Sequence, residues 1–146
     1  MEQGHKQAQK LFLQLGVQQG FDVAKQWSKT LPTDGVWLAR ETNLWKGQLP
    51  YAAIEVLGSE KGKVVMGSIA TLERASPCVG ILLLQDLQIE RRCYRAGMSE
   101  SETEEKVKRE FDRVKSLTVG STQRLVVWKT SALVHRVQEQ GEFINV

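Results

Sequence analysis

Cysteine is scarce in this chain, and no long apolar run occurs. The two cysteines, Cys78 and Cys93, are too few for a disulfide framework, so we expect free thiols in a reducing, cytoplasmic compartment. The apolar stretches fall well short of the roughly 18–20 residues that span a bilayer. The N-terminus is polar and leads into an amphipathic stretch, unlike a secretory signal. We therefore expect no membrane partner.

Several chemical motifs are absent as well. The two histidines, His5 and His135, have no histidine or cysteine companion at a zinc-site spacing. Neither glycine-rich phosphate-binding motif occurs, and no serine or cysteine nucleophile motif is present. These absences argue against a zinc enzyme, a nucleotide-binding loop and covalent nucleophilic catalysis.

What is present suits one domain. The chain has 146 residues, of which 41% are hydrophobic and 25% charged, as is typical of a globular domain with a single core. The net charge of +3 permits nucleic-acid binding without requiring it. The densest basic cluster, residues 90–95, is interpreted as an exposed loop.

Hydrophobic periodicity predicts alternating helices and strands. The expected elements are helix 2–19, strands 21–28, 33–39 and 50–57, helix 61–75, strand 78–86, helix 99–117, strand 124–129 and helix 130–140. Residues 86–97 are expected to prolong a strand and then loop out, and residues 141–146 to form a tail or an edge strand. The strand–helix–strand unit from 50 to 86 implies a parallel pair with a right-handed crossover. The sequence therefore predicts an α/β domain with a mixed central sheet flanked by helices.

Two carboxylates stand out in the predicted sheet. Asp34 lies at the start of one strand, and Glu55 is the single charge inside the apolar strand 50–57. Burial of an unpaired carboxylate is costly, so Glu55 needs a partner. It is either paired with an arginine, or it joins Asp34 in holding a hard divalent cation through oxygen ligands.

The order of elements around these carboxylates resembles the core of the PD-(D/E)XK nuclease superfamily, which includes restriction endonucleases and Holliday-junction resolvases. The matching residues are Pro32-Thr33-Asp34-Gly35 for the "PD" element and Glu55-Val56-Leu57 for the "ExK" element. The resemblance covers roughly residues 2–85. It implies a restriction-endonuclease-like fold, DNA as the partner, and metal-dependent hydrolysis of DNA phosphodiester bonds.

The resemblance also implies a metal site. In the family, two carboxylates and a main-chain carbonyl bind Mg²⁺, with Mn²⁺ as a substitute, beside the scissile phosphate. Here these ligands are Asp34, Glu55 and the carbonyl of Val56. The metal polarises the phosphate and lowers the pKa of a bound water. Small enzymes of this type often act as homodimers that cut two strands, and the resemblance implies a homodimer here.

One position departs from the family pattern. The family's lysine follows the glutamate by two residues and stabilises developing charge, but this chain has Leu57 there. Lys61 or Lys63 is the predicted surrogate, since both lie just beyond the strand. Lys25 and Gln85 are further options from neighbouring strands.

Two other readings remain open. In the first, the chain keeps the nuclease fold without catalysis and serves as a DNA-binding or assembly subunit. In the second, the chain is an unrelated interaction protein in which Asp34 and Glu55 make local pairs. Geometry separates these readings. A nuclease needs the two carboxylates within about 5 Å of each other to share one ion. They must also be reachable from solvent, unpaired with arginine and next to a basic surface.

Overall fold

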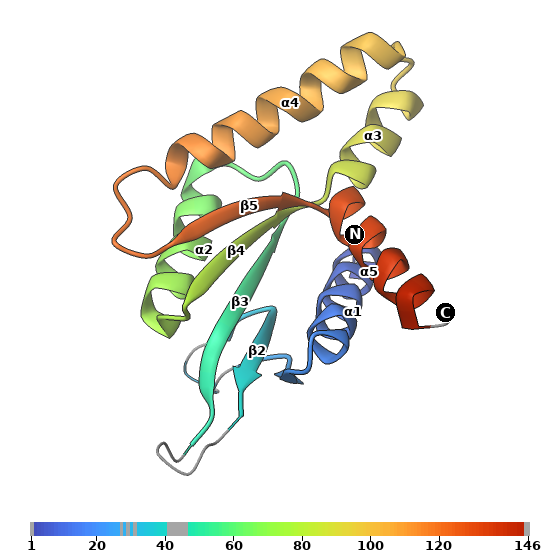
Figure 1. The fold of residues 1–146 in the computed structure, drawn as a ribbon. Coiled ribbons are helices and arrows are strands. Elements are labelled where there is room, and N and C mark those ends of the chain that lie inside the picture. Colours follow the sequence, from blue (N-terminus) through green and yellow to red (C-terminus); the bar gives the residue numbers. More distant parts are fainter. Residues whose placement is uncertain (1, 27, 29, 31, 41–46, 145–146) are drawn as a thin grey trace.

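The computed structural model describes residues 2–26, 28, 30, 32–40 and 47–144, which form a mixed sheet with helices on both faces (Figure 1). The element bounds are α1 (Glu2–Gln18), β1 (Asp22–Ala24), β2 (Gly35–Ala39), β3 (Leu49–Leu57), α2 (Gly62–Ala75), β4 (Val79–Leu84), α3 (Asp86–Arg95), α4 (Glu100–Leu117), β5 (Leu125–Lys129) and α5 (Thr130–Ile144). The predicted α/β architecture, with a mixed central sheet flanked by helices, is confirmed.

The sheet has five strands in the order β1-β2-β3-β4-β5. The first three pair antiparallel, whereas β3, β4 and β5 run parallel. Parallel neighbours need a crossover, which α2 provides between β3 and β4. The carboxyl ends of β3, β4 and β5 therefore meet at one edge of the sheet, where β2 begins. Ligands of open α/β sheets bind characteristically outside such an edge.

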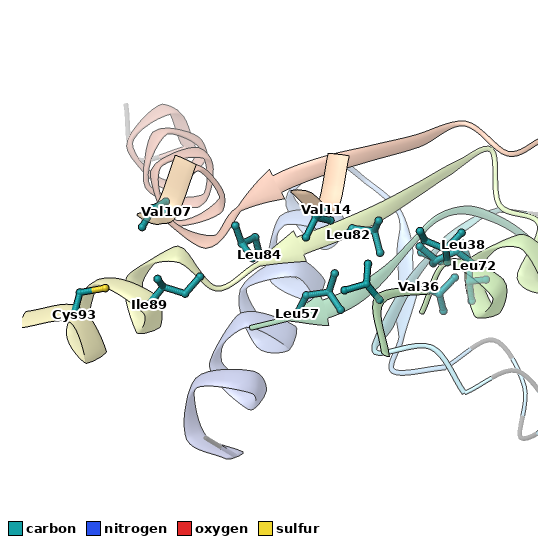
Figure 2. Close-up of a cluster of buried hydrophobic side chains, with 13 residues drawn as sticks. Val36, Leu38, Leu57, Leu72, Leu82, Leu84, Ile89, Cys93, Val107 and Val114 are labelled. Atoms are coloured by element: carbon teal, nitrogen blue, oxygen red, sulfur yellow. The ribbon is translucent and has the colours of Figure 1, made fainter. Parts of the chain in front are cut away.

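Side-chain alternation along the strands divides the core between the two faces of the sheet. On one face, Val36, Ala53 and Leu57 pack against α2, α3 and α4, as Figure 2 shows for the labelled part of this cluster. On the other face, Trp37, Ile54 and Val56 pack against α1 and α5. Because β3 is apolar on both faces, the one charge within it, Glu55, is 9% exposed.

Four local predictions were wrong or too long. Residues 86–97 form α3 and the turn after it instead of a strand and loop. The helix ends in a hydrogen bond from Met98 N to Cys93 O, with Gly97 at a positive φ of 80°.

The other three differences are local. β1 covers only three residues, and Trp27 of the longer predicted strand lies outside the described residues. Residues 141–144 continue α5. Cys78, expected in a buried strand, precedes β4 and is exposed.

A buried carboxylate fixes α3 against α5. Asp86, at the start of α3, is 3% exposed and accepts hydrogen bonds from the main-chain N and the hydroxyl of Ser131. The carboxylate thus caps the N-terminus of α5, where main-chain N–H groups lack helical partners. Among the described helices, none is both long and apolar enough to cross a membrane.

Gly16 in α1 is required by close packing. A Cβ at Gly16 would lie 2.5 Å from the Trp37 ring, whose Nε1 donates to Phe12 O at 2.9 Å. Glycine-to-alanine exchange inside a helix ordinarily stabilises by up to about 1 kcal/mol. We predict that Gly16→Ala instead destabilises by about 1–3 kcal/mol, because the indole ring must move within a packed core.

The matched control is Gly67→Ala in α2, where a Cβ would meet nothing within 4 Å. Gly67→Ala should raise the free energy of unfolding, and urea denaturation measures both variants. Equal effects of the two exchanges would contradict the proposed packing of Trp37 on α1.

Candidate active site

Asp34 and Glu55 meet at the carboxyl edge of the sheet. Asp34 precedes β2, and its main-chain N donates to Ile54 O at 3.0 Å and to Glu55 Oε2 at 3.2 Å. In return, Val56 N donates to Asp34 Oδ2 at 2.8 Å. These bonds join the start of β2 to the end of β3 and bring the two carboxyl groups together, as the nuclease interpretation requires.

Glu55 is protonated far more readily than an ordinary glutamate. Burial is the largest cause; together with repulsion from the Asp34 carboxylate and a hydrogen bond between the two side chains, it raises the pKa of Glu55 from 4.5 to about 8. A hydrogen bond from Ser68 of α2 acts in the opposite sense. Among the described residues, no arginine or lysine forms an ion pair with Glu55. Glu55 therefore lies buried beside the partly exposed Asp34, and it has no lysine or arginine partner in the part of the chain that the structure describes.

The oxygen donors present suit a hard divalent cation. The main-chain N and carbonyl of Val56 both point to the side of β3 that faces β2. Strand β2 begins at Gly35, which pairs with Ile54, so no β2 residue pairs with Val56. No group of three or more histidine, cysteine, aspartate or glutamate side chains among the described residues could hold a metal ion. Two carboxylates, one carbonyl and waters form a ligand set of the kind that Mg²⁺ accepts.

Two polar residues of α1 contact Asp34. His5 Nε2 lies 3.1 Å from Asp34 Oδ1, and Gln9 donates to the Asp34 carbonyl. The two residues are four apart, so they share one face of the helix. Asp34 keeps 25% of its side chain exposed, so solvent reaches the pair beside His5.

Leu57, which stands where the PD-(D/E)XK pattern has a lysine, is part of the core. Leu57 is 1% exposed and points into the cluster between the sheet and α2, α3 and α4 (Figure 2). Lys61 immediately precedes α2, and Lys63 lies in its first turn; both are exposed. Neither forms an ion pair with Asp34 or Glu55 in the part of the chain that the structure describes. The structure thus brings Asp34, Glu55 and Val56 together, but it does not join the two lysines to them.

The remaining options also lie at this edge. Lys25 follows β1 and is exposed. Gln85 is buried at the end of β4, its main-chain N donates to Leu57 O at 2.7 Å, and its side chain lies against α1 at Gly4.

Two contacts of the carboxylate pair, His5 with Asp34 and Ser68 with Glu55, were not predicted from the sequence. His5 was considered only as a zinc ligand, although the spacing of His5 and Gln9 on one helix face was a usable signal. Ser68 carries no such signal, because its contact with Glu55 depends on how α2 packs across the sheet.

No protein-family model matches this chain, and neither a curated protein nor a solved structure matches it. Function is therefore inferred from the chemistry of the site itself.

The raised pKa of Glu55 predicts a pH-dependent stability. Between pH 4.5 and about 8, the folded protein holds a proton on Glu55 that the unfolded chain releases. Stability then falls with rising pH in this window by up to about 1.4 kcal/mol per unit. Glu55→Gln keeps an oxygen for Asp34 N but cannot ionise. Its stability relative to wild type should increase by on the order of 2–4 kcal/mol from pH 5 to pH 8.

Urea denaturation in a chelating buffer at several pH values measures this difference. Glu105→Gln, an exposed position on α4, is the control and should follow the wild-type curve. Parallel curves for wild type and Glu55→Gln would show that Glu55 ionises normally in the folded state.

Proposed function

We propose that this protein is a metal-dependent endonuclease of the PD-(D/E)XK type that hydrolyses DNA phosphodiester bonds. The observation that carries the proposal is the pairing of buried Glu55 with partly exposed Asp34 at the carboxyl edge of the parallel strands. There, burial and mutual repulsion raise the pKa of Glu55 to about 8, and no basic side chain among the described residues forms an ion pair with it. An isolated structural carboxylate is ordinarily paired or moved to the surface.

Each residue has a definite part in such a reaction. Asp34, Glu55 and the Val56 carbonyl would hold a Mg²⁺ or Mn²⁺ ion, and Glu55 would have to be ionised to do so. The ion would supply charge that polarises the scissile phosphate and makes water more acidic. His5 orients the Asp34 carboxylate through the 3.1 Å contact and is a positioning residue. Val56 N fixes the other oxygen of Asp34.

A positive charge that stabilises the reacting phosphate has to come from outside β3, because Leu57 is buried in the core. Ser68 marks the face of α2 that is turned toward Glu55. At 3.6 residues per turn, Lys63 is rotated from that face by about 140°. Lys61 precedes the helix as its N-cap, with an extended backbone (φ −66°, ψ 154°), and is not bound to that rotation. Lys61 is therefore the better surrogate.

A second candidate function follows from Leu57. A chain that has lost the lysine and retains the fold would bind DNA or a partner subunit without cutting. Homodimer formation accompanies either function in the proposal, since it would present two sites to two strands. DNA as the substrate and two free cysteines fit a reducing, cytoplasmic location.

The first experiment measures Mg²⁺ and Mn²⁺ binding to wild type and Glu55→Gln by calorimetry. Because Glu55 has to lose its proton, wild-type affinity should rise about tenfold per pH unit up to about pH 8, and binding should release one proton. Glu55→Gln should bind at least tenfold more weakly without this pH dependence. Glu105→Gln serves again as the control.

Cleavage of supercoiled and branched DNA is followed with the same proteins. Metal-dependent nicking that disappears in Glu55→Gln supports the endonuclease. Metal binding without nicking supports the non-catalytic candidate. Wild type that neither binds metal nor nicks DNA would leave the carboxylate pair as a structural feature.

The two lysines offer an internal comparison. We predict that Lys61→Ala lowers the rate constant for nicking by about a hundredfold at saturating metal, the order expected for loss of a positioned charge, whereas Lys63→Ala changes it by less than about twofold. Metal affinity should be unchanged in both variants. If Lys61→Ala nicks at the wild-type rate, another group supplies the charge.

A further inference from the structure

A groove of about 710 Å³ lies between three helices beside the candidate active site. α1 contributes Gln7 and Leu11, α5 contributes Val134, and α3 contributes three arginines, Arg91, Arg92 and Arg95. We call it the arginine groove. It opens at the same edge of the sheet as the carboxylate pair, because α3 and α5 begin where β4 and β5 end (Figure 1).

The arginines share one side of α3. Gln88, Arg91, Arg92 and Arg95 fall at i, i+3, i+4 and i+7, which places them along one helix face. Ile89 and Cys93 lie on another face and are buried in the core. The basic cluster of the sequence is therefore an ordered stripe on a helix, with Arg91 and Arg95 about 6 Å apart along its axis.

The charge of this stripe is not neutralised by the described residues. Arg91, Arg92 and Arg95 are exposed and form no ion pair with a described acidic side chain. Among the side chains that the structure describes, no acidic one lines the groove. The buried acid on the same helix, Asp86, accepts hydrogen bonds from the main-chain N and hydroxyl of Ser131. Three guanidinium groups converge on one concave surface, and guanidinium is well matched to phosphate oxygens.

The groove adjoins the carboxylate pair through α1. Gly4 lines the groove, where an added Cβ would meet the Gln88 side chain at 1.8 Å, and the next residue, His5, contacts Asp34. Gly4, Gln7 and Leu11 form the groove side of α1, whereas His5 and Gln9 form the side facing Asp34. The groove and the carboxylate pair therefore lie on two sides of the same turns of α1.

We propose that the arginine groove binds the sugar–phosphate backbone of a single nucleic-acid strand next to the scissile phosphate. That the bound polyanion is a nucleic acid rests on the proposed function. A volume of about 710 Å³ is that of a small-molecule cleft and admits a few nucleotides, not a duplex. None of the described residues that line the groove is aromatic, so contacts are made to phosphates and not by base stacking. Binding depends strongly on salt and little on base sequence.

The test measures binding of fluorescent single-stranded oligonucleotides of mixed sequence by anisotropy, in a chelating buffer so that no cleavage is needed. The variant replaces all three arginines: Arg91→Gln, Arg92→Gln and Arg95→Gln. Each phosphate contact contributes about 0.7 to the slope of log affinity against log salt for single strands, so the slope should decrease by about 2. Affinity near physiological salt should fall at least tenfold.

The matched control replaces three exposed basic residues outside the groove: Lys108→Gln, Arg109→Gln and Arg124→Gln. It removes the same charge and should keep most of the affinity. Circular dichroism and thermal unfolding check that both triple variants are folded. The single variant Arg95→Gln, in the last turn of α3, should lower the slope by about 0.7.

The outcomes are distinguishable. Equal loss in both triple variants, or no loss in either, would overturn the proposal. Equally tight binding of polyglutamate would instead assign the groove to an acidic protein segment, and full competition by a mononucleotide would reduce it to a small phosphate pocket. A duplex that binds better than the single strand would also contradict it. Selective loss in the groove variant without any metal-dependent nicking by wild type would uphold the groove and reject the endonuclease.

Discussion

The hydrogen bond from Val56 N to the Asp34 carboxylate connects the fold to the candidate site. β2 begins at Gly35, so the outer side of β3 has no strand partner beyond Ile54. The Asp34 side chain takes that place and satisfies a main-chain donor that burial would otherwise leave costly. The same contact brings the carboxyl group of Asp34, just before β2, to Glu55 in β3. A structural requirement of the sheet thereby creates a concentration of negative charge.

That concentration of charge has an energetic consequence. Two carboxyl groups at a buried sheet edge cannot both ionise cheaply, and the pKa of Glu55 moves to about 8. Near neutral pH the site therefore holds a proton where a divalent cation would bind. In the proposed site, a cation and a proton would compete for the same oxygens, so metal affinity, pH and folding stability would be linked.

Helix α1 separates the carboxylate pair from the arginine groove. One face packs on the sheet through Ala8 and Phe12, a second presents His5 to Asp34, and a third lines the arginine groove. The core between the sheet and α2, by contrast, has no room for a charged side chain at position 57, because Leu57 packs there.

The sequence alone determined most of the alternation of strands and helices and the parallel β3–β4 unit. These features follow from local periodicity and from the rule that a parallel pair needs a crossover. For Glu55 the sequence left two partners open, Asp34 and an arginine, and the tertiary structure decided for Asp34. α3 was missed because Ile89 and Cys93 give it only a sparse apolar face among charged residues. The carboxyl proton on Glu55, the contact of His5 with Asp34 and the grouping of three arginines opposite α1 were decided only by tertiary structure. Each depends on burial or on distances between elements far apart in the chain, and neither quantity is encoded in local spacing.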